Sequence, residues 1–107
     1  KDIIIRGGEN IPVAEVEGLL YRHPSIVDAA VVAMPDHRLG ERACAFITLK
    51  SGSALELVDL QQYFAAEGMA RQYMPERLEV IDEMPRTASG KIQKFQLREQ
   101  AVKLRLD

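Results

Sequence analysis

Residues 85–94 read PRTASGKIQK, a polar, turn-forming stretch in which one lysine, Lys91, directly follows a glycine. A strand-like apolar run precedes this stretch, and a charged, helix-like tail follows it. This succession of strand, polar turn and helix predicts a loop that is held at both ends and presents the Lys91 ammonium at its tip. A cation held in this way suits a site that meets concentrated negative charge, such as a carboxylate or a phosphate.

The tripeptide Ser89-Gly90-Lys91 does not complete a phosphate-binding P-loop. That motif needs a glycine six positions before its lysine and a serine or threonine directly after it. Pro85 and Ile92 stand at those positions instead. Short Ser-Gly-Lys segments are common in solvated turns, so this loop by itself does not establish a function.

A second candidate segment is residues 1–11, KDIIIRGGENI, in which two adjacent glycines, Gly7 and Gly8, follow a β-branched run. Glycines permit unusual backbone angles and a close approach of the backbone to another surface. The spacing is not that of a dinucleotide-binding glycine-rich loop. Taken alone, a glycine pair before a helix is an ordinary structural turn.

The elements that must position these two segments follow from the hydrophobic pattern. We predict an α+β fold in the order β-α-β-β-α-β-α: a small sheet of about three main strands with a short N-terminal β segment, packed by about three helices. The second and third strands are expected to pair antiparallel as a hairpin. Strands are predicted at residues 2–6, 26–34, 41–50 and 77–81, and helices at 12–23, 57–67 and 95–104.

Composition excludes several classes of protein. The 107 residues suit one domain, and the net charge of −2 is spread along the chain, which is not typical of a nucleic-acid-binding protein. No apolar run approaches the roughly 18 residues of a membrane span. The lone cysteine, Cys44, lies in an apolar run and is expected to be buried. A single cysteine cannot form an internal disulfide, which favours a reducing, cytoplasmic compartment. His23 and His37 lack partners at metal-ligand spacing, so no metal site is predicted.

Together, the motifs resemble the C-terminal domain of acyl-CoA synthetases and related adenylate-forming enzymes. The resemblance rests on the start of the chain, the helix that begins near Pro12, the run from His23-Pro24 to Pro35-Asp36 and Gly40-Glu41, and the Lys91 loop. These motifs occur in family order and span essentially the whole chain. The sequence GGENI at residues 7–11 is most similar to that of the carboxylic acid:CoA ligase branch, which includes medium-chain acid ligases.

The resemblance implies a mobile lid, residues 1–107, that adopts two poses over a large N-terminal domain. In the first, Lys91 is the catalytic lysine of acid adenylation. In the second, Gly7, Gly8 and Glu9 line the channel through which the CoA pantetheine arm reaches the acyl-adenylate. Lys1 corresponds to the hinge. The loop residues that support Lys91 are Arg86, Thr87, Ser89 and Gly90.

The same resemblance implies the substrates and partners. ATP, Mg²⁺ and the carboxylic acid are held mainly by the N-terminal domain, and CoA is the thiol substrate. The chain begins at Lys1, inside a motif, and is therefore expected to be an excised domain that does not catalyse a reaction by itself. An accessible Lys91 is also a candidate for acetylation by a lysine acetyltransferase, with reversal by a deacetylase, because acetylation removes the positive charge.

Two alternatives stay open: the same lid from a peptide-synthetase adenylation domain, and a non-catalytic α+β interaction module. Several individual residues also carry expectations. Lys94 is interpreted as a solvated helix charge, Arg71 and Arg77 as candidates for the nucleotide end of CoA, and Asp36 and Glu41 as organisers of the turn between two strands.

Overall fold

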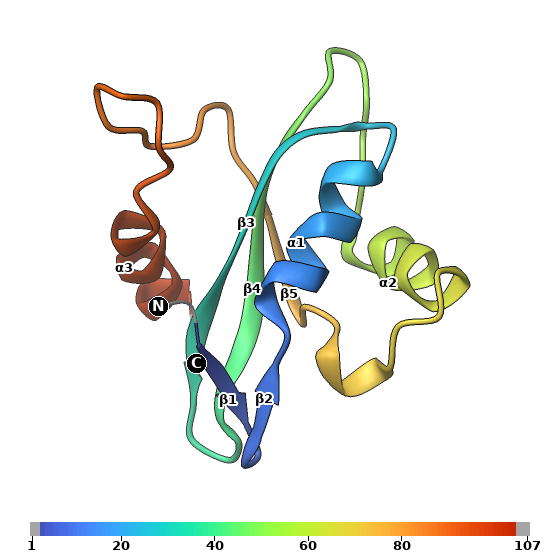
Figure 1. The fold of residues 1–107 in the computed structure, drawn as a ribbon, viewed down its shortest axis with the longest axis vertical. Coiled ribbons are helices and arrows are strands. Elements are labelled where there is room, and N and C mark those ends of the chain that lie inside the picture. Colours follow the sequence, from blue (N-terminus) through green and yellow to red (C-terminus); the bar gives the residue numbers. More distant parts are fainter. Residues whose placement is uncertain (1–2, 105–107) are drawn as a thin grey trace.

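The structure of the chain, a computed structural model, describes residues 3–104 (Figure 1). Lys1, the predicted hinge, lies outside the described residues. A 3₁₀ turn at Arg71–Tyr73 precedes the last strand. The strands are β1 (Ile4–Arg6), β2 (Glu9–Ile11), β3 (Ile26–Asp36), β4 (Gly40–Leu49) and β5 (Arg77–Val80), and the helices are α1 (Val13–Arg22), α2 (Leu57–Ala66) and α3 (Lys94–Leu104).

The longest strand pair, β3 and β4, runs through the middle of the molecule. The two strands pair antiparallel from Ile26 opposite Leu49 to Asp36 opposite Gly40. The other side of β4 is shared: β1 pairs with its first residue, and β5 pairs in parallel with Cys44–Ile47. Among the described strands, β2 pairs with β1 alone, so the strand order β2-β1-β4-β3 leaves β3 at one edge of the sheet.

The sheet separates two apolar cores, because alternate residues of a strand point to opposite faces. Val31, Ala45 and Ile47 face α1 and α2. Val32 and Phe46 face α3, where Leu97 and Ala101 cover them. The fold therefore has three layers, with α1 and α2 on one face of the sheet and α3 on the other (Figure 1).

The predicted α+β fold class is confirmed, with one strand added. Residues 9–11 form β2, although the sequence pattern assigned them to the approach to the first helix. The reason is the Gly7-Gly8 pair, whose φ angles of 56° and 85° are both positive. Two consecutive positive φ angles form the tight turn that joins antiparallel strands. The N-terminal β segment is thus a hairpin, and Ile11 is buried in the core that α1 covers.

An ion network fixes the first hairpin to the sheet. The Glu76 carboxylate accepts hydrogen bonds from Arg6 Nε at 2.9 Å and from Arg42 Nη1 at 2.7 Å. Arg42 Nε also donates to Asp36 Oδ1 at 2.8 Å. The Arg42 hydrogen bond, followed by the backbone N–H of Leu39, lowers the pKa of Asp36 to about 2. The network joins β1, the β3–β4 turn and the residue before β5.

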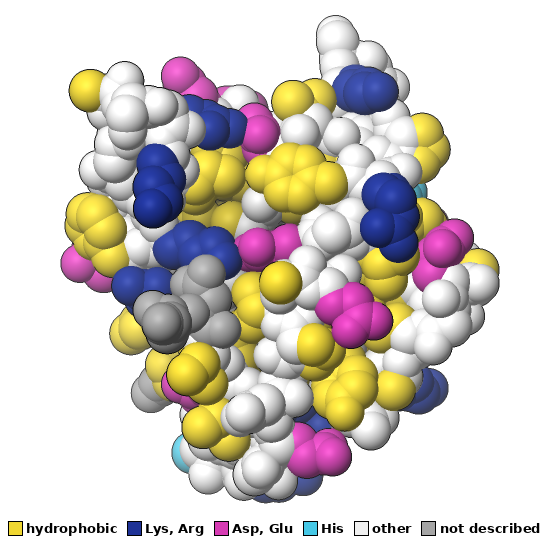
Figure 2. Space-filling model, viewed as in Figure 1, with side chains coloured by type: hydrophobic (Ala, Val, Ile, Leu, Met, Phe, Trp, Pro, Cys, Tyr) yellow, Lys and Arg dark blue, Asp and Glu magenta, His cyan; other side chains and the backbone are white. Residues whose placement is uncertain are grey.

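Charged side chains of both signs are interspersed on the face shown in Figure 2 and do not form a region of one sign. None of the helices in residues 3–104 is long and apolar enough to cross a membrane.

Cys44 is fully buried beneath α3, and desolvation raises the pKa of its thiol to about 12. We expect a thiol reagent at pH 8 to label the folded chain at least about 100-fold more slowly than the chain in concentrated urea, since the thiolate is the reactive form. Labelling is measured by mass spectrometry over time. An Ala66→Cys variant, exposed at the end of α2, should label quickly in the folded state. Fast labelling of Cys44 without denaturant would contradict this burial.

Because the folded-state pKa of Asp36 lies below its unfolded value of about 4, its carboxylate stabilises the fold above that pH, and this contribution is lost as the pH falls toward 2. Asp36→Asn should therefore lower the melting temperature at pH 6, and the difference from the parent chain should shrink between pH 4 and pH 2. Thermal unfolding followed by circular dichroism measures this. Glu99→Gln, at an exposed position of α3, is the control and should show no comparable trend. A constant difference across this range would rule out the assigned role.

Candidate functional site

The segment that carries Lys91 is a short hairpin. Arg86 and Ile92 form an antiparallel bridge. The Thr87 N–H donates to the Lys91 carbonyl at 2.8 Å, and the Gln93 N–H donates to the Pro85 carbonyl at 2.8 Å. These bonds close the base of the loop and place Lys91 near its tip, as the sequence predicts.

The tip is organised by the side chain of Thr87. Its Oγ1 accepts the Lys91 N–H at 3.1 Å and lies 2.9 Å from Ser89 Oγ, while its carbonyl accepts the Gly90 N–H at 2.9 Å. Gly90 has a φ of 94°, a conformation that side-chain-bearing residues rarely adopt. All four residues predicted to support Lys91 take part in the loop's own hydrogen bonds, because Arg86 Nη1 also donates to the Gly90 carbonyl.

Lys91 itself is exposed, and the structure describes no hydrogen bond or ion pair for its ammonium within residues 3–104. A lysine with a free ammonium on an ordered backbone can approach an anionic ligand without first breaking an internal contact. The arrangement therefore presents one positive charge, at a fixed point of the backbone, to a partner outside the described chain.

Two ion pairs fix the loop to the body of the domain. At the entry, Arg86 Nη2 lies 2.7 Å from Asp28 Oδ1 in β3. At the exit, Lys94 Nζ lies 2.6 Å from Glu17 Oε2 in α1. The interpretation of Lys94 as a solvated charge is therefore wrong, because only 17% of its side chain is exposed and its ammonium pairs with Glu17.

The Gly7-Gly8 turn rests on the turn between β3 and β4. The Gly7 N–H donates to the Leu39 carbonyl at 2.8 Å, and a Cβ on Gly7 would lie 3.3 Å from Leu39 Cδ2. Asp36 accepts the N–H groups of Arg38 and Leu39, which confirms its predicted role in this turn.

Two acidic residues near this turn differ in their contacts. Glu41 accepts the Ile5 N–H at 2.9 Å and so holds β1 against the sheet. Glu9, which the resemblance places in the pantetheine channel with Gly7 and Gly8, is exposed.

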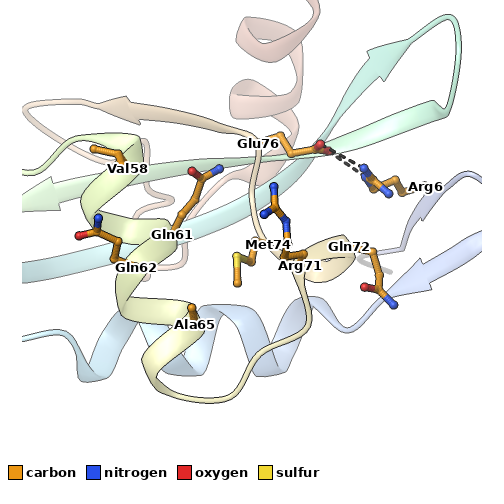
Figure 3. Close-up of a pocket in the computed structure, with 9 residues that line it drawn as sticks. All are labelled: Arg6, Val58, Gln61, Gln62, Ala65, Arg71, Gln72, Met74 and Glu76. Atoms are coloured by element: carbon orange, nitrogen blue, oxygen red, sulfur yellow. Dashed lines mark hydrogen bonds and ion pairs between the residues drawn. The ribbon is translucent and has the colours of Figure 1, made fainter.

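A pocket of about 490 Å³ lies between α2 and the segment before β5, and Arg6, the residue before Gly7, also lines it (Figure 3). Arg71 lines the pocket and has no described ion pair, whereas Arg77 pairs with Glu79 at 2.7 Å and does not line it. The sequence offers Arg71 and Arg77 equally as candidates for the nucleotide end of CoA, but of the two only Arg71 lines the pocket. The lining residues are Arg6, Val58, Gln61, Gln62, Ala65, Arg71, Gln72, Met74 and Glu76.

The Lys91 loop and the Gly7-Gly8 turn lie at opposite ends of the molecule (Figure 1). β3 connects the two ends: Asp28, near its start, contacts the loop, and Asp36, at its end, holds the turn. Eight residues of extended strand span about 26 Å. The structure therefore does not bring the two predicted site segments together in one cleft.

The histidines do not contribute to either site segment. His23 Nδ1 accepts the Ser25 N–H at 3.0 Å, and its ring packs edge-on against Tyr63 with centroids 4.7 Å apart. His37 is exposed in the β3–β4 turn. Within the described part of the chain, no group of three or more His, Cys, Asp or Glu side chains is placed to hold a metal ion.

Sequence reasoning missed Asp28, Glu17, Arg6 and Glu76. One available signal was Asp28 itself, a charged residue inside an apolar strand run, which has to find a partner. Arg6 and Glu76 are 70 residues apart in sequence. Their pairing depends on the position of β5 beside β4, which no local pattern indicates.

Comparison with known proteins identifies relatives of this chain. The medium-chain fatty-acid–CoA ligase of Escherichia coli is 51% identical over 104 residues, covering 96% of this chain and 18% of that protein. The pyochelin synthase PchD of Pseudomonas aeruginosa is 50% identical over 99 residues, covering 92% of this chain and 18% of that protein. The crystal structure of a Brucella canis acyl-CoA synthetase superposes with a TM-score of 0.87 at 32% identity, covering 97% of this chain and 20% of that one.

The chain thus spans about a fifth of the length of these relatives. Residues 15–91 match the family described as the AMP-binding enzyme C-terminal domain, a match that includes β3, β4 and the loop as far as Lys91. The chain belongs to the AMP-binding enzyme C-terminal domain family.

Proposed function

We propose that this chain is the lid domain of an AMP-forming carboxylic acid:CoA ligase and serves two successive steps with its two ends. The observation that carries the proposal is the exposed Lys91 on a hydrogen-bonded loop, at the opposite end of β3 from the Gly7-Gly8 turn. Two segments held at opposite ends of a strand stretch about 26 Å long cannot occupy one reaction centre at the same time. Each can act in turn if the domain rotates over an N-terminal domain that holds the acid and ATP.

In the first step, the acid's carboxylate attacks the α-phosphate of ATP. A carboxylate-oxygen–phosphorus bond forms, the bond to the β-phosphate breaks, and pyrophosphate leaves with the electron pair. Carboxylate and polyphosphate repel each other because both are negative. The Lys91 ammonium, inserted between them, offsets this repulsion and stabilises the transition state. A point charge on a flexible stem suits this role, since no bidentate geometry is required.

In the second step, the sulfur of CoA attacks the acyl carbonyl carbon of the adenylate and loses its proton to solvent. A carbon–sulfur bond forms, the bond from the acyl carbon to the phosphate oxygen breaks, and AMP leaves with the electron pair. Gly7 and Gly8 offer a backbone surface without side chains, against which a thin pantetheine arm can pass. The Cβ position of Gly8 meets no other atom within 4 Å, so the outer side of this turn is open. Glu9 follows directly in β2 and would line the same channel.

The pocket between α2 and the segment before β5 supports a place for the nucleotide end of CoA. Arg71 lines the pocket and has no ion-pair partner among residues 3–104, and Arg6, the residue before Gly7, lines the same pocket. Phosphate groups are bound well by guanidinium donors. A CoA whose arm passes the Gly7-Gly8 turn can therefore place its phosphates near Arg71.

The second candidate is the same lid in a carrier-dependent adenylation enzyme, in which a protein-bound pantetheine takes the place of CoA. It is favoured by the 50% identity to a protein named as a pyochelin synthase rather than as a CoA ligase. The Arg71 pocket favours CoA, because a carrier-bound arm lacks the adenine nucleotide.

Magnesium, like the acid and ATP, is assigned to the N-terminal domain in this proposal. The cytoplasmic location and the acetylation of Lys91 both stay predictions. The identity of the acid is a property of the N-terminal domain in this proposal.

We expect Lys91→Ala in the full-length enzyme to lower ATP–pyrophosphate exchange about 10²- to 10³-fold, since one preorganised charge at the transition state is lost. Thioester formation from a preformed acyl-adenylate should keep its rate. Radiolabelled pyrophosphate measures the first reaction, and chromatography of the thioester measures the second. Exchange at the parent rate would remove Lys91 from the adenylation step.

We expect Arg71→Ala to raise the KM for CoA about 10-fold, because a charge-assisted contact to phosphate is lost. ATP–pyrophosphate exchange should not change. The matched control is Arg77→Ala, whose guanidinium pairs with Glu79 outside the pocket. A KM for CoA that responds equally to both substitutions, or to neither, would argue against this pocket as the nucleotide site.

A further inference from the structure

The Arg86 guanidinium bridges two parts of the chain with two different nitrogens. Its Nη1 donates to the Gly90 carbonyl at 2.6 Å, and its Nη2 lies 2.7 Å from Asp28 Oδ1. Gly90 immediately precedes Lys91, so the first contact holds the peptide unit that carries the lysine. The second contact holds that unit to β3. A planar guanidinium suits this bridge because its donors point in fixed directions.

The position of Asp28 is set by the pairing of β3 with β4. The Asp28 N–H donates to Thr48 Oγ1 at 3.1 Å. Asp28 precedes Ala30 and Val32 at intervals of two residues, and both of these face α3. It therefore points to the side of the sheet on which the loop lies. The side chain is 26% exposed, so the Arg86 ion pair is open to solvent but not fully solvated.

The exit of the loop is fixed to the same strand. The Glu17 Oε2 that contacts Lys94 Nζ also accepts the N–H of Val31 in β3 at 2.8 Å. One carboxylate oxygen therefore links α1, β3 and the first residue of α3. With Asp28 at the entry and Glu17 at the exit, both ends of the loop are attached to β3.

We propose that Asp28 and Arg86 are positioning residues for Lys91, and that the loop is a rigid part of the domain. The proposal rests on the proposed role of Lys91 in adenylation. Bending the loop away from the sheet would break the Asp28–Arg86 pair, while the Glu17–Lys94 pair fixes the end of the loop at the start of α3. Presenting or withdrawing Lys91 therefore requires movement of the whole domain.

The first test follows the loop itself, by hydrogen–deuterium exchange of residues 85–93 in the full-length enzyme. Arg86→Ala and, separately, Asp28→Asn should each speed exchange of the Gly90 and Lys91 amides, whose acceptors belong to Thr87. Arg22→Ala, an exposed arginine on α1, is the control and should leave this segment unchanged. If hydrogen exchange of these amides is unchanged in both Arg86→Ala and Asp28→Asn, the proposal is overturned. This holds whether or not Lys91 serves adenylation.

The second test separates positioning from direct contact with substrate. We expect Arg86→Ala to lower the kcat of ATP–pyrophosphate exchange about 10- to 100-fold through misplacement of Lys91. Asp28→Asn, which breaks one partly exposed ion pair, should lower it up to about 5-fold. The KM for ATP should not change, and thioester formation from preformed acyl-adenylate should keep its rate. Arg86→Lys keeps the positive charge but lacks the fixed planar donors of a guanidinium. Its kcat for exchange should therefore lie between those of Arg86→Ala and the parent enzyme.

The decisive measurement is the double variant. If Arg86 acts through Lys91, adding Arg86→Ala to Lys91→Ala causes no further loss of exchange. A further loss, or a higher KM for ATP in Arg86→Ala alone, means that Arg86 contacts the nucleotide itself, and the positioning role is wrong. If Lys91→Ala leaves exchange intact, the proposed function fails instead, and the hydrogen-exchange test still decides whether Arg86 and Asp28 hold the loop.

Discussion

The antiparallel pairing of β3 with β4 is the constraint on which the rest of the structure depends. Its register, from Ile26 opposite Leu49 to Asp36 opposite Gly40, decides which residues face each core. A shift by one residue would exchange the two faces and bury the wrong side chains against α3. The same register fixes where Asp28 and Asp36 stand, and through them where the two site segments lie.

The fold could be predicted where the local pattern and the tertiary environment agree. The apolar runs that became β3 and β4 are buried on both faces, so their near-continuous hydrophobicity is a reliable signal of a central strand pair. The helix that starts after Pro12 was also clear, because its apolar residues recur at helical spacing. The ends of these elements moved by only one or two residues, as helix and strand ends commonly do.

The rest depended on contacts between distant parts of the chain. β5 pairs in parallel with β4 only because the chain returns past α2, and a four-residue strand carries too little pattern to indicate its neighbour. β2 is short, and Asn10 inside it and Pro12 after it are equally typical of a helix start. Lys91 could be selected as a candidate because the sequence of its loop is distinctive, whereas the partner of Asp28 could not be known without the register of β3. The network around Glu76 required the same long-range information.

The carboxylate of Glu17 also covers part of an exposed edge of the sheet, where a strand of another molecule could otherwise pair. β3 ends the strand order, and an edge strand with free N–H and carbonyl groups invites a strand from another chain. Glu17 occupies the N–H of Val31 from outside, and the Lys94 side chain lies over the same place. Charged groups thus block the middle of this edge. The middle of this edge is therefore protected against pairing with a strand of another molecule, and with it against one route to aggregation.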